Sequence, residues 1–412
     1  MTIHKWTTAV FAITLAIPFS VFAQEQQAHG LARLPHYSVK DLGTLGGAYS
    51  YAYGLNNAGL VAGAAATMAQ DGDPAQSMFQ APQTAFLWEH GRIRNLGTLG
   101  GPSSEAGRPN TFGEAAIISE TATLDPHGAD FCGFGTHLQC LGAIWKNGKL
   151  KALALLPGGN NSIALDVNDR SQVIGFADTD NYDPDCAATA GFQFQAVLWE
   201  SNGAARLLSP LPGDTVAFGF GINNHGQAVG ASGVCANATP PLSPNAPHAV
   251  LWERDGTPVN LGSLGGVRNI PSAISNRGDV SGTSMTTDGS LHAFLWTKES
   301  GQMRDLGTVP GFVTFINPCC NTINAQREIV GFMFDANFNS HAFYYSRSHM
   351  VDLNDLLSKD AQTEWLLQTA ESINESGQIV GYGLHNGQTR AFLATPCHDH
   401  EFGNQSWEDN DR

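Results

Sequence analysis

The chain reads Gly54-Leu55-Asn56-Asn57-Ala58-Gly59-Leu60-Val61-Ala62-Gly63 near its amino-terminal end. An Asn caps a tight turn with its side chain and a Gly three residues later accepts positive φ, so this motif predicts two strands joined by a hairpin. Six relatives of the motif follow. The first Asn, or its equivalent, which we call the lead residue, stands at positions 56, 110, 168, 223, 275, 324 and 374, a mean spacing of 53 residues.

Two further elements recur between these hairpins. The first is an apolar run that ends in Trp in five copies, as in Ala85-Phe86-Leu87-Trp88, and the second is Asp41-Leu42-Gly43-Thr44-Leu45-Gly46-Gly47. The apolar run predicts a third strand, and the turn after it leads into a fourth strand that ends at Asp-Leu-Gly. One period therefore holds four short antiparallel strands, and repetition of such units at this spacing is typical of a β-propeller.

We predict an all-β fold, a seven-bladed β-propeller of four-stranded antiparallel blades. The chain opens with a lone fourth-type strand, Tyr37 to Gly43, and closes after a third-type strand, Ala391 to Ala394, that lacks its own fourth. The amino-terminal strand should therefore complete the last blade and close the ring.

Three groups of residues carry finer expectations about the blades. Small residues four positions before each lead residue, such as Ala52 and Ala106, indicate innermost strands near the axis. Large rings that end equivalent strands should be buried between blades; they are Trp88, Trp145, Trp199, Trp252 and Trp296. Helical turns are expected only at 353–357 and 363–367.

The two ends of the chain differ in composition from the repeats. Met1 to Ala23 has a polar start, a broken apolar run and small residues before the cleavage position, which is typical of a signal peptide rather than a membrane span. We therefore expect a signal peptide at 1–23, a linker at 24–36, the propeller at 37–397 and a disordered acidic tail at 398–412. The mature protein should be secreted or periplasmic, with no membrane span.

The charge balance narrows the classes of partner. Lys and Arg number 21 against 37 Asp and Glu, which gives a net charge of −16. A surface without a basic stripe cannot replace the counterions of a phosphate backbone, so nucleic acid is excluded as a partner. An extracellular protein or a carbohydrate remains, and we expect a monomer.

Seven cysteines fit an oxidising compartment. Cys132 and Cys140 stand eight residues apart in one Gly-rich insertion and form the preferred pair. Cys186 and Cys235 follow equivalent strands of successive repeats, so their loops should emerge side by side and allow a second disulfide. No cysteine spacing matches a zinc site, and the odd count leaves at least one thiol without an intramolecular partner.

The three coupled motifs resemble the extracellular HAF-repeat family of bacteria, which is named after a His-Ala-Phe triplet. That triplet is intact at His292-Ala293-Phe294 and at His341-Ala342-Phe343. The resemblance covers about Tyr37 to Thr395 and implies an exported bacterial repeat protein; it brings no activity and no catalytic residues. The chain departs from the pattern in the second repeat, whose hairpin is degenerate, and in the third strands, where Thr84, Gly142 and Gln195 replace His.

Candidate chemistry in the sequence is sparse. The acidic loop at 178–185 carries Asp178, Asp180, Asp183 and Asp185, which offer oxygen ligands for Ca²⁺ but lack the EF-hand pattern, so a solvated loop is the simpler interpretation. His248, His292 and His341 occupy equivalent positions in successive blades and should form a ring of hydrogen-bonding groups rather than one cluster. No cofactor is expected apart from this candidate Ca²⁺ site.

The sequence contains none of the common catalytic motifs, such as Gly-x-Ser-x-Gly or His-Glu-x-x-His. The leading interpretation is a secreted propeller that acts as a binding or interaction scaffold rather than as an enzyme. The alternative is an extracellular hydrolase or lyase that acts on a polysaccharide at the axial mouth. A set of carboxylates, His or Tyr converging in one polar funnel would favour the enzyme.

Overall fold

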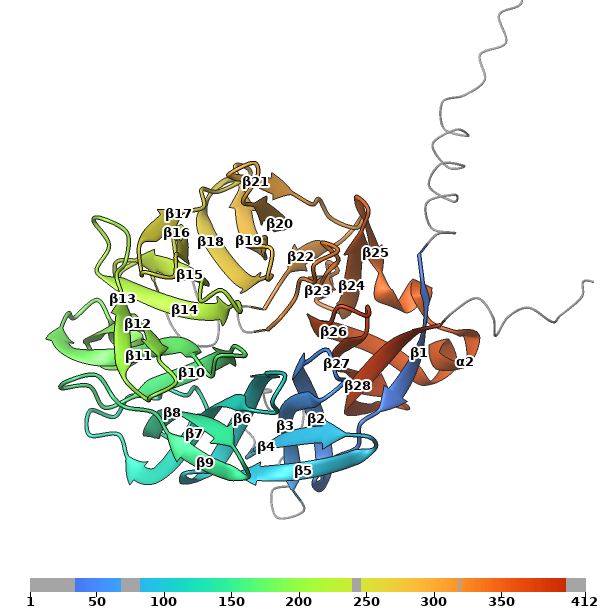
Figure 1. Ribbon diagram of the computed structural model, residues 1–412. Coiled ribbons are helices and arrows are strands. Elements are labelled where there is room, and N and C mark those ends of the chain that lie inside the picture. Colours follow the sequence, from blue (N-terminus) through green and yellow to red (C-terminus); the bar gives the residue numbers. More distant parts are fainter. Residues whose placement is uncertain (1–33, 68–81, 239–245, 318–319, 398–412) are drawn as a thin grey trace, which may run out of the picture. The chain divides into compact units, whose positions relative to one another are not determined.

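A computed structural model describes residues 34–67, 82–238, 246–317 and 320–397. Residues 36–397 form seven four-stranded antiparallel sheets arranged in a ring, and we call each sheet a blade (Figure 1). The predicted seven-bladed propeller is thus confirmed. Among the residues described, no helix is long and apolar enough to cross a membrane. The predicted signal peptide and the predicted acidic tail lie outside the described residues.

The first four blades follow one another along the chain, and each begins with its innermost strand (Figure 1). Blade 1 contains β2 (Gly46–Leu55), β3 (Val61–Thr67), β4 (Thr84–Glu89) and β5 (Arg92–Gly97). Blade 2 contains β6 (Gly100–Pro109), β7 (Ala115–Leu124), β8 (Leu138–Lys146) and β9 (Lys149–Ala152). Blade 3 contains β10 (Ser162–Val167), β11 (Val173–Tyr182), β12 (Phe192–Trp199) and β13 (Ala205–Leu208). Blade 4 contains β14 (Val216–Ile222), β15 (Ala228–Gly233), β16 (His248–Trp252) and β17 (Pro258–Asn260).

The last three blades repeat this order until the ring closes. Blade 5 contains β18 (Gly265–Ile274), β19 (Val280–Thr286), β20 (Leu291–Thr297) and β21 (Gln302–Asp305). Blade 6 contains β22 (Val313–Phe315), β23 (Ile329–Phe334), β24 (Ser340–Ser346) and β25 (His349–Asp352). Blade 7 contains β26 (Trp365–Ile373), β27 (Ile379–His385) and β28 (Gln388–Cys397), and its fourth strand is β1 (His36–Asp41).

Closure occurs where the sequence predicts it. Strand β1 pairs antiparallel with β28, with Val39 opposite Ala394 and Asp41 opposite Phe392. The first strand of the chain therefore covers an edge that β28 would otherwise expose.

The hairpin motif ends in Gly for a steric reason. Gly63 lies opposite Ala52 on the innermost strand, and a Cβ on Gly63 would approach the Tyr51 carbonyl oxygen to 2.0 Å. Gly175, Gly230 and Gly381 occupy the same position in later blades and meet the same obstruction. Only Gly allows the second strand to lie this close to the first.

Buried apolar side chains fill the interfaces between blades. Val61, Trp88 and Val380, for example, pack in one cluster between blades 1 and 7. Four of the five repeated tryptophans are at most 7% exposed; they are Trp88, Trp199, Trp252 and Trp296. Trp145 is partly buried. The predicted burial of these rings is confirmed for four of them, which argues against their use as exposed ligand platforms.

The helical prediction was right for one segment and misplaced for the other. Residues Leu353–Leu356 form the 3₁₀ helix η2, close to the predicted 353–357. The second helix, α2 (Lys359–Glu364), begins earlier than the predicted 363–367, because the Ser358 side chain caps it by accepting a hydrogen bond from the Ala361 N–H. Trp365 already begins strand β26. A further 3₁₀ turn, η1, spans Ala187–Thr189.

Candidate functional site

The lead Asn of each hairpin performs two tasks with one side chain. In blade 1, Asn56 Oδ1 accepts hydrogen bonds from the backbone N–H groups of Ala58 at 2.9 Å and Leu60 at 3.0 Å. This is the predicted turn cap. Asn56 Nδ2 also donates to the backbone carbonyl of Asn110, the lead residue of the next blade, at 2.9 Å. The motif therefore closes its own turn and links its blade to the next.

These inter-blade bonds form a ring around the axis. Six lead side chains donate to the backbone carbonyl of the next lead residue, at 2.9 to 3.2 Å; the donors are Asn56, Asn110, Asn168, Asn223, Asn324 and Asn374. The seventh lead residue is Ser275, which has no amide to donate. At that interface between blades 5 and 6, Arg327 instead pairs with the buried carboxylate of Asp279 at 2.7 Å.

A second set of inter-blade bonds lies one residue further along the turns, at five of the seven interfaces. The backbone N–H of Asp169 donates to the Asn224 side chain at 2.9 Å, and the N–H of Asn224 donates to the Asn276 side chain at 2.9 Å. Similar bonds join Thr111 to Asp169, Ala325 to Glu375 and Glu375 to Asn57. The hairpin turns of neighbouring blades are therefore held in fixed positions around the axis.

The turns enclose a polar pocket at this end of the axis, which we call the axial mouth. Its lining comes from all seven blades and consists of Leu55, Asn56, Asn57, Arg108, Pro109, Asn110, Thr111, Asp169, Asn223, Asn224, Ile274, Ser275, Asn276, Asn321, Ile323 and Glu375. Amide and hydroxyl groups dominate it. The single cation, Arg108, is already committed to Asp166 through two hydrogen bonds of 3.0 and 3.1 Å.

An exposed aromatic residue directly follows one of the lining residues of the axial mouth in the sequence. Phe112 follows Thr111 in the second hairpin and is 72% exposed. The Phe112 backbone N–H donates to Asn110 Oδ1 at 3.0 Å, so the hydrogen bonds of the turn do not involve the Phe112 side chain. The degenerate second repeat thus adds an apolar surface beside a polar pocket.

A second polar cluster lies deeper between the innermost strands, and we call it the tyrosine–glutamate cluster. It comprises Tyr49, Tyr51 and Tyr53 of β2, Tyr382 of β27, Glu105 of β6 and Glu371 of β26. The Tyr51 ring lies 4.9 Å from that of Tyr382 and 6.4 Å from that of Tyr53, measured between centroids. Both carboxyls act electrostatically on Tyr53, whose pKa is raised first by burial and then by Glu105 and Glu371 among its neighbours.

The two carboxyls of this cluster have no cationic partner among the described residues. Burial raises the pKa of Glu105 to about 7, partly offset by a hydrogen bond from Gln83. Burial likewise raises the pKa of Glu371 to about 7, offset in part by Asn317 and Thr369. Asn317 Nδ2 donates to Glu371 Oε1 at 2.6 Å. Both groups titrate near neutral pH because their charged forms are poorly solvated.

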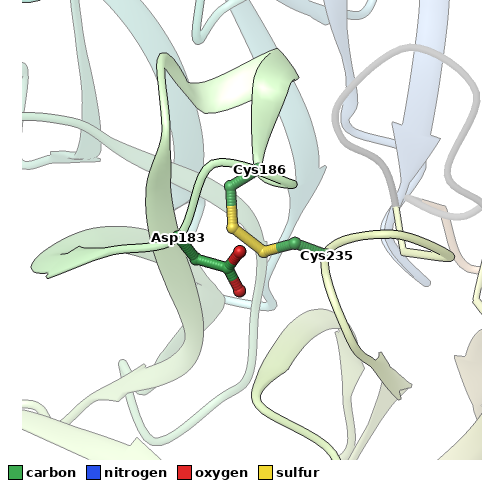
Figure 2. Close-up of side chains that lie close together, drawn as sticks. All are labelled: Asp183, Cys186 and Cys235. Carbon is green, nitrogen blue, oxygen red and sulfur yellow. A yellow bond between two sulfur atoms is a disulfide. The ribbon is translucent and has the colours of Figure 1, made fainter.

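The predicted disulfides are present. Cys132 and Cys140 are bonded with a Cα separation of 5.3 Å, and Cys186 and Cys235 with a separation of 4.7 Å. The second bridge links the loop of blade 3 to that of blade 4 (Figure 2). Cys320 is also disulfide-bonded. Cys397 is a free thiol, consistent with the odd cysteine count.

The four aspartates of the acidic loop do not converge. Asp178 is 3% exposed, and its Oδ1 accepts hydrogen bonds from the backbone N–H groups of Asn160 and Asn161. Asp183 instead lies beside the Cys186–Cys235 disulfide (Figure 2), and these three residues are the one group of three potential metal ligands in the described ranges. Because both sulfurs are bonded to each other, they are not metal ligands. Calcium binding by this loop stays a prediction.

The histidine column forms separate pairs, as expected. His248 Nδ1 lies 2.8 Å from Asp214, His292 Nδ1 lies 2.9 Å from Asp305, and His341 Nδ1 lies 2.6 Å from Asp352. His385 of blade 7 pairs with Asp41 of β1 in the same way, at 3.0 Å. Each His pairs with one Asp of its own blade or of the loop that leads into that blade, so these histidines have a structural role.

The sequence did not predict the tyrosine–glutamate cluster or the Arg108–Asp166 pair. A signal was available, since Glu371 stands three residues before its lead Asn, in an innermost strand whose other residues are uncharged. A charged residue in a buried strand indicates either a partner or a site.

No family model and no curated protein matches the chain. Solved structures with a similar arrangement include the β-propeller domain of the Trilobed protease from Pyrococcus furiosus, with 10% identity, a TM-score of 0.48, and coverage of 85% of this chain and 99% of that one. Virginiamycin B lyase from Staphylococcus aureus shows 10% identity and a TM-score of 0.47, covering 88% and 100%. A putative TolB from Agrobacterium tumefaciens shows 11% identity and a TM-score of 0.42, covering 74% and 95%. These neighbours are β-propellers, and a likeness at this level indicates no ligand and no activity for this chain.

Proposed function

We propose that this protein is an exported binding scaffold that holds a carbohydrate at the axial mouth. The observation that carries the proposal is the combination of an amide-lined pocket with the exposed Phe112 ring beside it. Each Asn side chain offers both a donor and an acceptor, as sugar hydroxyls do, and an exposed aromatic ring supplies a flat apolar surface.

The charge of the axial mouth supports a neutral ligand. Arg108 is neutralised by Asp166, so it offers no free cation for an acidic group. Asp169 is held in the ionised state, because hydrogen bonds from Thr111 and Asn224 outweigh the effect of burial and lower its pKa. Its carboxylate oxygens are occupied by those bonds. A ligand recognised here would rely on hydrogen bonds rather than on ion pairs.

Export is supported by two features. The described disulfides require an oxidising compartment to persist, and the first 23 residues have the composition of a signal peptide. We therefore place the mature protein in the periplasm or outside the cell. The similarity of the motifs to the HAF-repeat family agrees with this proposal.

The alternative function, a polysaccharide hydrolase or lyase, rests on Glu105 and Glu371. Each has a pKa near 7, which suits a general acid or base. Glu371 is only 1% exposed, however, and a polymer cannot reach it while the blades stay packed. The axial mouth itself presents no nucleophile paired with a base. Binding is therefore the better supported function.

The test is a screen of the full-length mature protein against an array of neutral and acidic oligosaccharides, followed by calorimetry on the glycans that bind. Replacing Phe112→Ala should weaken binding about tenfold by removing the stacking surface. Thr111→Trp should abolish binding by filling the mouth. Because the Thr111 side chain also hydrogen-bonds Asp169 of the next blade, thermal unfolding is used to show that this variant stays folded.

Thr257→Trp is the matched control, because Thr257 lies in an exposed outer turn away from the mouth. It should bind as the wild type does. The proposal is wrong if no glycan binds, or if Phe112→Ala and Thr111→Trp bind as well as the control. Release of shorter products from a bound glycan would instead favour the enzyme.

A further inference from the structure

The two sets of inter-blade bonds around the axial mouth are interrupted together at one interface of the described turns, between blades 5 and 6. The lead residue of blade 5 is Ser275, which has no amide to donate to the Asn324 carbonyl. The residue after the lead Asn of blade 6 is Ala325, which has no side-chain oxygen to accept from the Asn276 N–H. Each of the other six interfaces has at least the bond from its lead Asn. We call this interruption the 5/6 gap.

Two backbone groups at the 5/6 gap lack the partner that their equivalents have. The N–H of Asn224 in blade 4 donates to the next blade at 2.9 Å, but the N–H of Asn276 in blade 5 has no acceptor in the described chain. The Asn324 carbonyl accepts only from the N–H of Arg327 in its own turn, at 3.0 Å. The repeat therefore places one unused donor and one half-used acceptor at the same interface.

The lead residue of blade 5 adds a further donor. Ser275 Oγ accepts from the N–H groups of Arg277 at 3.3 Å and Asp279 at 3.2 Å. Its hydroxyl proton has no acceptor within the described residues, although Ser275 is only 4% exposed. Buried polar groups are normally paired, so the missing acceptor points to a group from outside the chain.

The 5/6 gap opens into the axial mouth. Ser275 and Asn276 line that pocket from blade 5, and Asn321 and Ile323 line it from blade 6. Ser and Ala are also smaller than the Asn side chains that occupy the equivalent positions in other blades. A ligand in the mouth can therefore reach the groups that the missing amides leave unpaired.

The two arginines of this interface do not take the place of the missing amides. The Arg327 guanidinium, which pairs with Asp279, donates only to carboxylates in the described chain. Arg277 Nη1 crosses the interface and donates to the Ala325 carbonyl at 3.2 Å. Neither side chain donates to the Asn324 carbonyl, and neither can accept from an N–H group.

The unpaired groups select the chemistry of their partner. A hydroxyl group accepts hydrogen bonds and also donates one, so it can accept from the Asn276 N–H and donate to the Asn324 carbonyl. A carboxylate can only accept, and an ammonium ion can only donate. The 5/6 gap is therefore complementary to a hydroxyl group rather than to an ion.

We propose that the 5/6 gap is the subsite of the axial mouth that holds a hydroxyl group of a neutral oligosaccharide. The hydroxyl oxygen accepts from Asn276 and Ser275, and its proton is donated to the Asn324 carbonyl. This inference rests on the proposed function, and it names the part of the mouth that selects the ligand.

The experiment uses the full-length mature protein and titrates it by calorimetry with cellotriose, maltotriose and mannotriose, together with any neutral glycan that the array identifies. We expect saturable binding of at least one of them. The fully O-methylated form of that glycan should bind about tenfold more weakly or worse, since it has no O–H to donate. The backbone amide signal of Asn276 in ¹⁵N spectra of the wild type should shift as the glycan saturates the protein.

A double variant, Ser275→Asn with Ala325→Asn, restores the two side chains that the 5/6 gap lacks. It should unfold at a higher temperature than the wild type, because it adds the inter-blade bonds that other interfaces have. It should also bind the glycan about tenfold more weakly or worse, because the new amides occupy the subsite. Ala58→Asn is the matched control, since Ala58 is exposed in the lead turn of blade 1 and does not line the mouth. This control should bind as the wild type does.

The outcomes separate this subsite from the proposed function. If no glycan binds the wild type, the proposed function and the subsite are both wrong. If a glycan binds and the double variant binds it equally well, the mouth holds carbohydrate elsewhere and only the subsite is wrong. Equal affinity for the O-methylated form, or an unchanged Asn276 amide signal at saturation, would also overturn the subsite alone. If the double variant does not fold, Ala325→Asn alone replaces it, with the same loss of binding expected.

Discussion

Single asparagines have more influence on this fold than their place in a turn suggests. Asn168 is 1% exposed; its Oδ1 accepts hydrogen bonds from Arg170 and Gln172, and its Nδ2 donates to the Asn223 carbonyl at 3.0 Å. The sequence predicts the first role, because the lead Asn of this motif caps its own turn, although Ser171 stands where most copies have Gly. The second role depends on where the next blade lies, and one period of sequence does not contain that information.

Asn168→Ala should therefore lower the free energy of unfolding by about 2 to 4 kcal/mol, since it leaves buried backbone groups unpaired in two blades. The matched control is Asn202→Ala. Asn202 caps an exposed turn through Ala204 at 2.9 Å and makes no described inter-blade bond. Denaturant unfolding measures both variants. If the two lose the same stability, the inter-blade bond contributes nothing and the ring has no energetic role.

Glu371 gives a pH dependence with a definite sign. Its pKa rises from 4.5 to about 7 on folding because of burial. The native state therefore keeps a proton that the unfolded state loses between about pH 4.5 and 7, and stability falls as pH rises through this window, by about 3 kcal/mol in total. Below the window both states are protonated and the contribution is constant.

Glu371→Gln cannot titrate, so the difference in unfolding free energy between the variant and the wild type isolates this group from the other carboxylates and histidines. The variant should gain stability relative to the wild type as pH rises from 5 to 8. A difference that stays flat with pH would contradict the raised pKa.

The sequence predicted the individual blades well and the interfaces between them poorly. The period of the motifs gives each sheet, and the order of strands within it follows from short turns. The junction between blades 5 and 6 was not foreseen, because Ser275 looks like a mild variant of the lead Asn. In the structure this change removes an inter-blade bond, and the Arg327–Asp279 pair stands in its place.

This junction can be tested with a double-mutant cycle. Asp279 is 2% exposed, so Arg327→Gln leaves a buried carboxylate without a counter-charge and should cost about 3 kcal/mol or more. Asp279→Asn in the same chain should recover part of that loss. Arg206→Gln serves as the comparison, because the Arg206–Glu200 pair is about one third exposed and should cost less than about 1 kcal/mol. Additive effects at 279 and 327 would show that the two side chains do not interact.

The two described disulfides differ in the length of chain that they close. Cys132 and Cys140 are eight residues apart, whereas Cys186 and Cys235 are 49 apart and join two blades. In the chain-entropy model the longer loop stabilises by roughly 4 kcal/mol and the shorter by less than 3. Double Cys→Ser variants of each pair should therefore unfold in that order, with 186/235 the less stable. The reverse order would mean that the insertion around Cys132 contributes more than loop closure.

The sequence predicted the architecture because the same motifs recur in every blade. It did not predict the sites, because these depend on residues that depart from the repeated motifs. Phe112 belongs to the degenerate second hairpin, and Glu105 and Glu371 are charged residues at positions that are uncharged in the other blades. A repeat pattern identifies what all blades share. Closure of the ring determines which residues from different blades become neighbours.

Closure itself depends on one short strand. Strand β1 pairs with β28 along its whole length, and Tyr37 within it is fully buried, with its ring 6.1 Å from that of Tyr344 in blade 6. The Tyr37 carbonyl also accepts a hydrogen bond from the Ser358 N–H at 2.9 Å. The strand therefore completes blade 7 and also contacts blade 6 and the linker between these two blades.

Removing residues 1–42 should expose the edge of β28, lower the unfolding temperature and cause association that increases with protein concentration, because an unpaired strand edge recruits other chains. Tyr37→Ala, which keeps the strand, should cost about 3 to 5 kcal/mol through the cavity that it leaves. The control is a chain that starts at residue 34, which retains β1 and should behave as the full mature protein. Sedimentation and thermal unfolding follow all three. If β1 acts by covering the edge of β28, a peptide of residues 35–43 added to the truncated chain should restore the monomer. A truncated chain that stays monomeric with an unchanged unfolding temperature would show that the ring closes without β1.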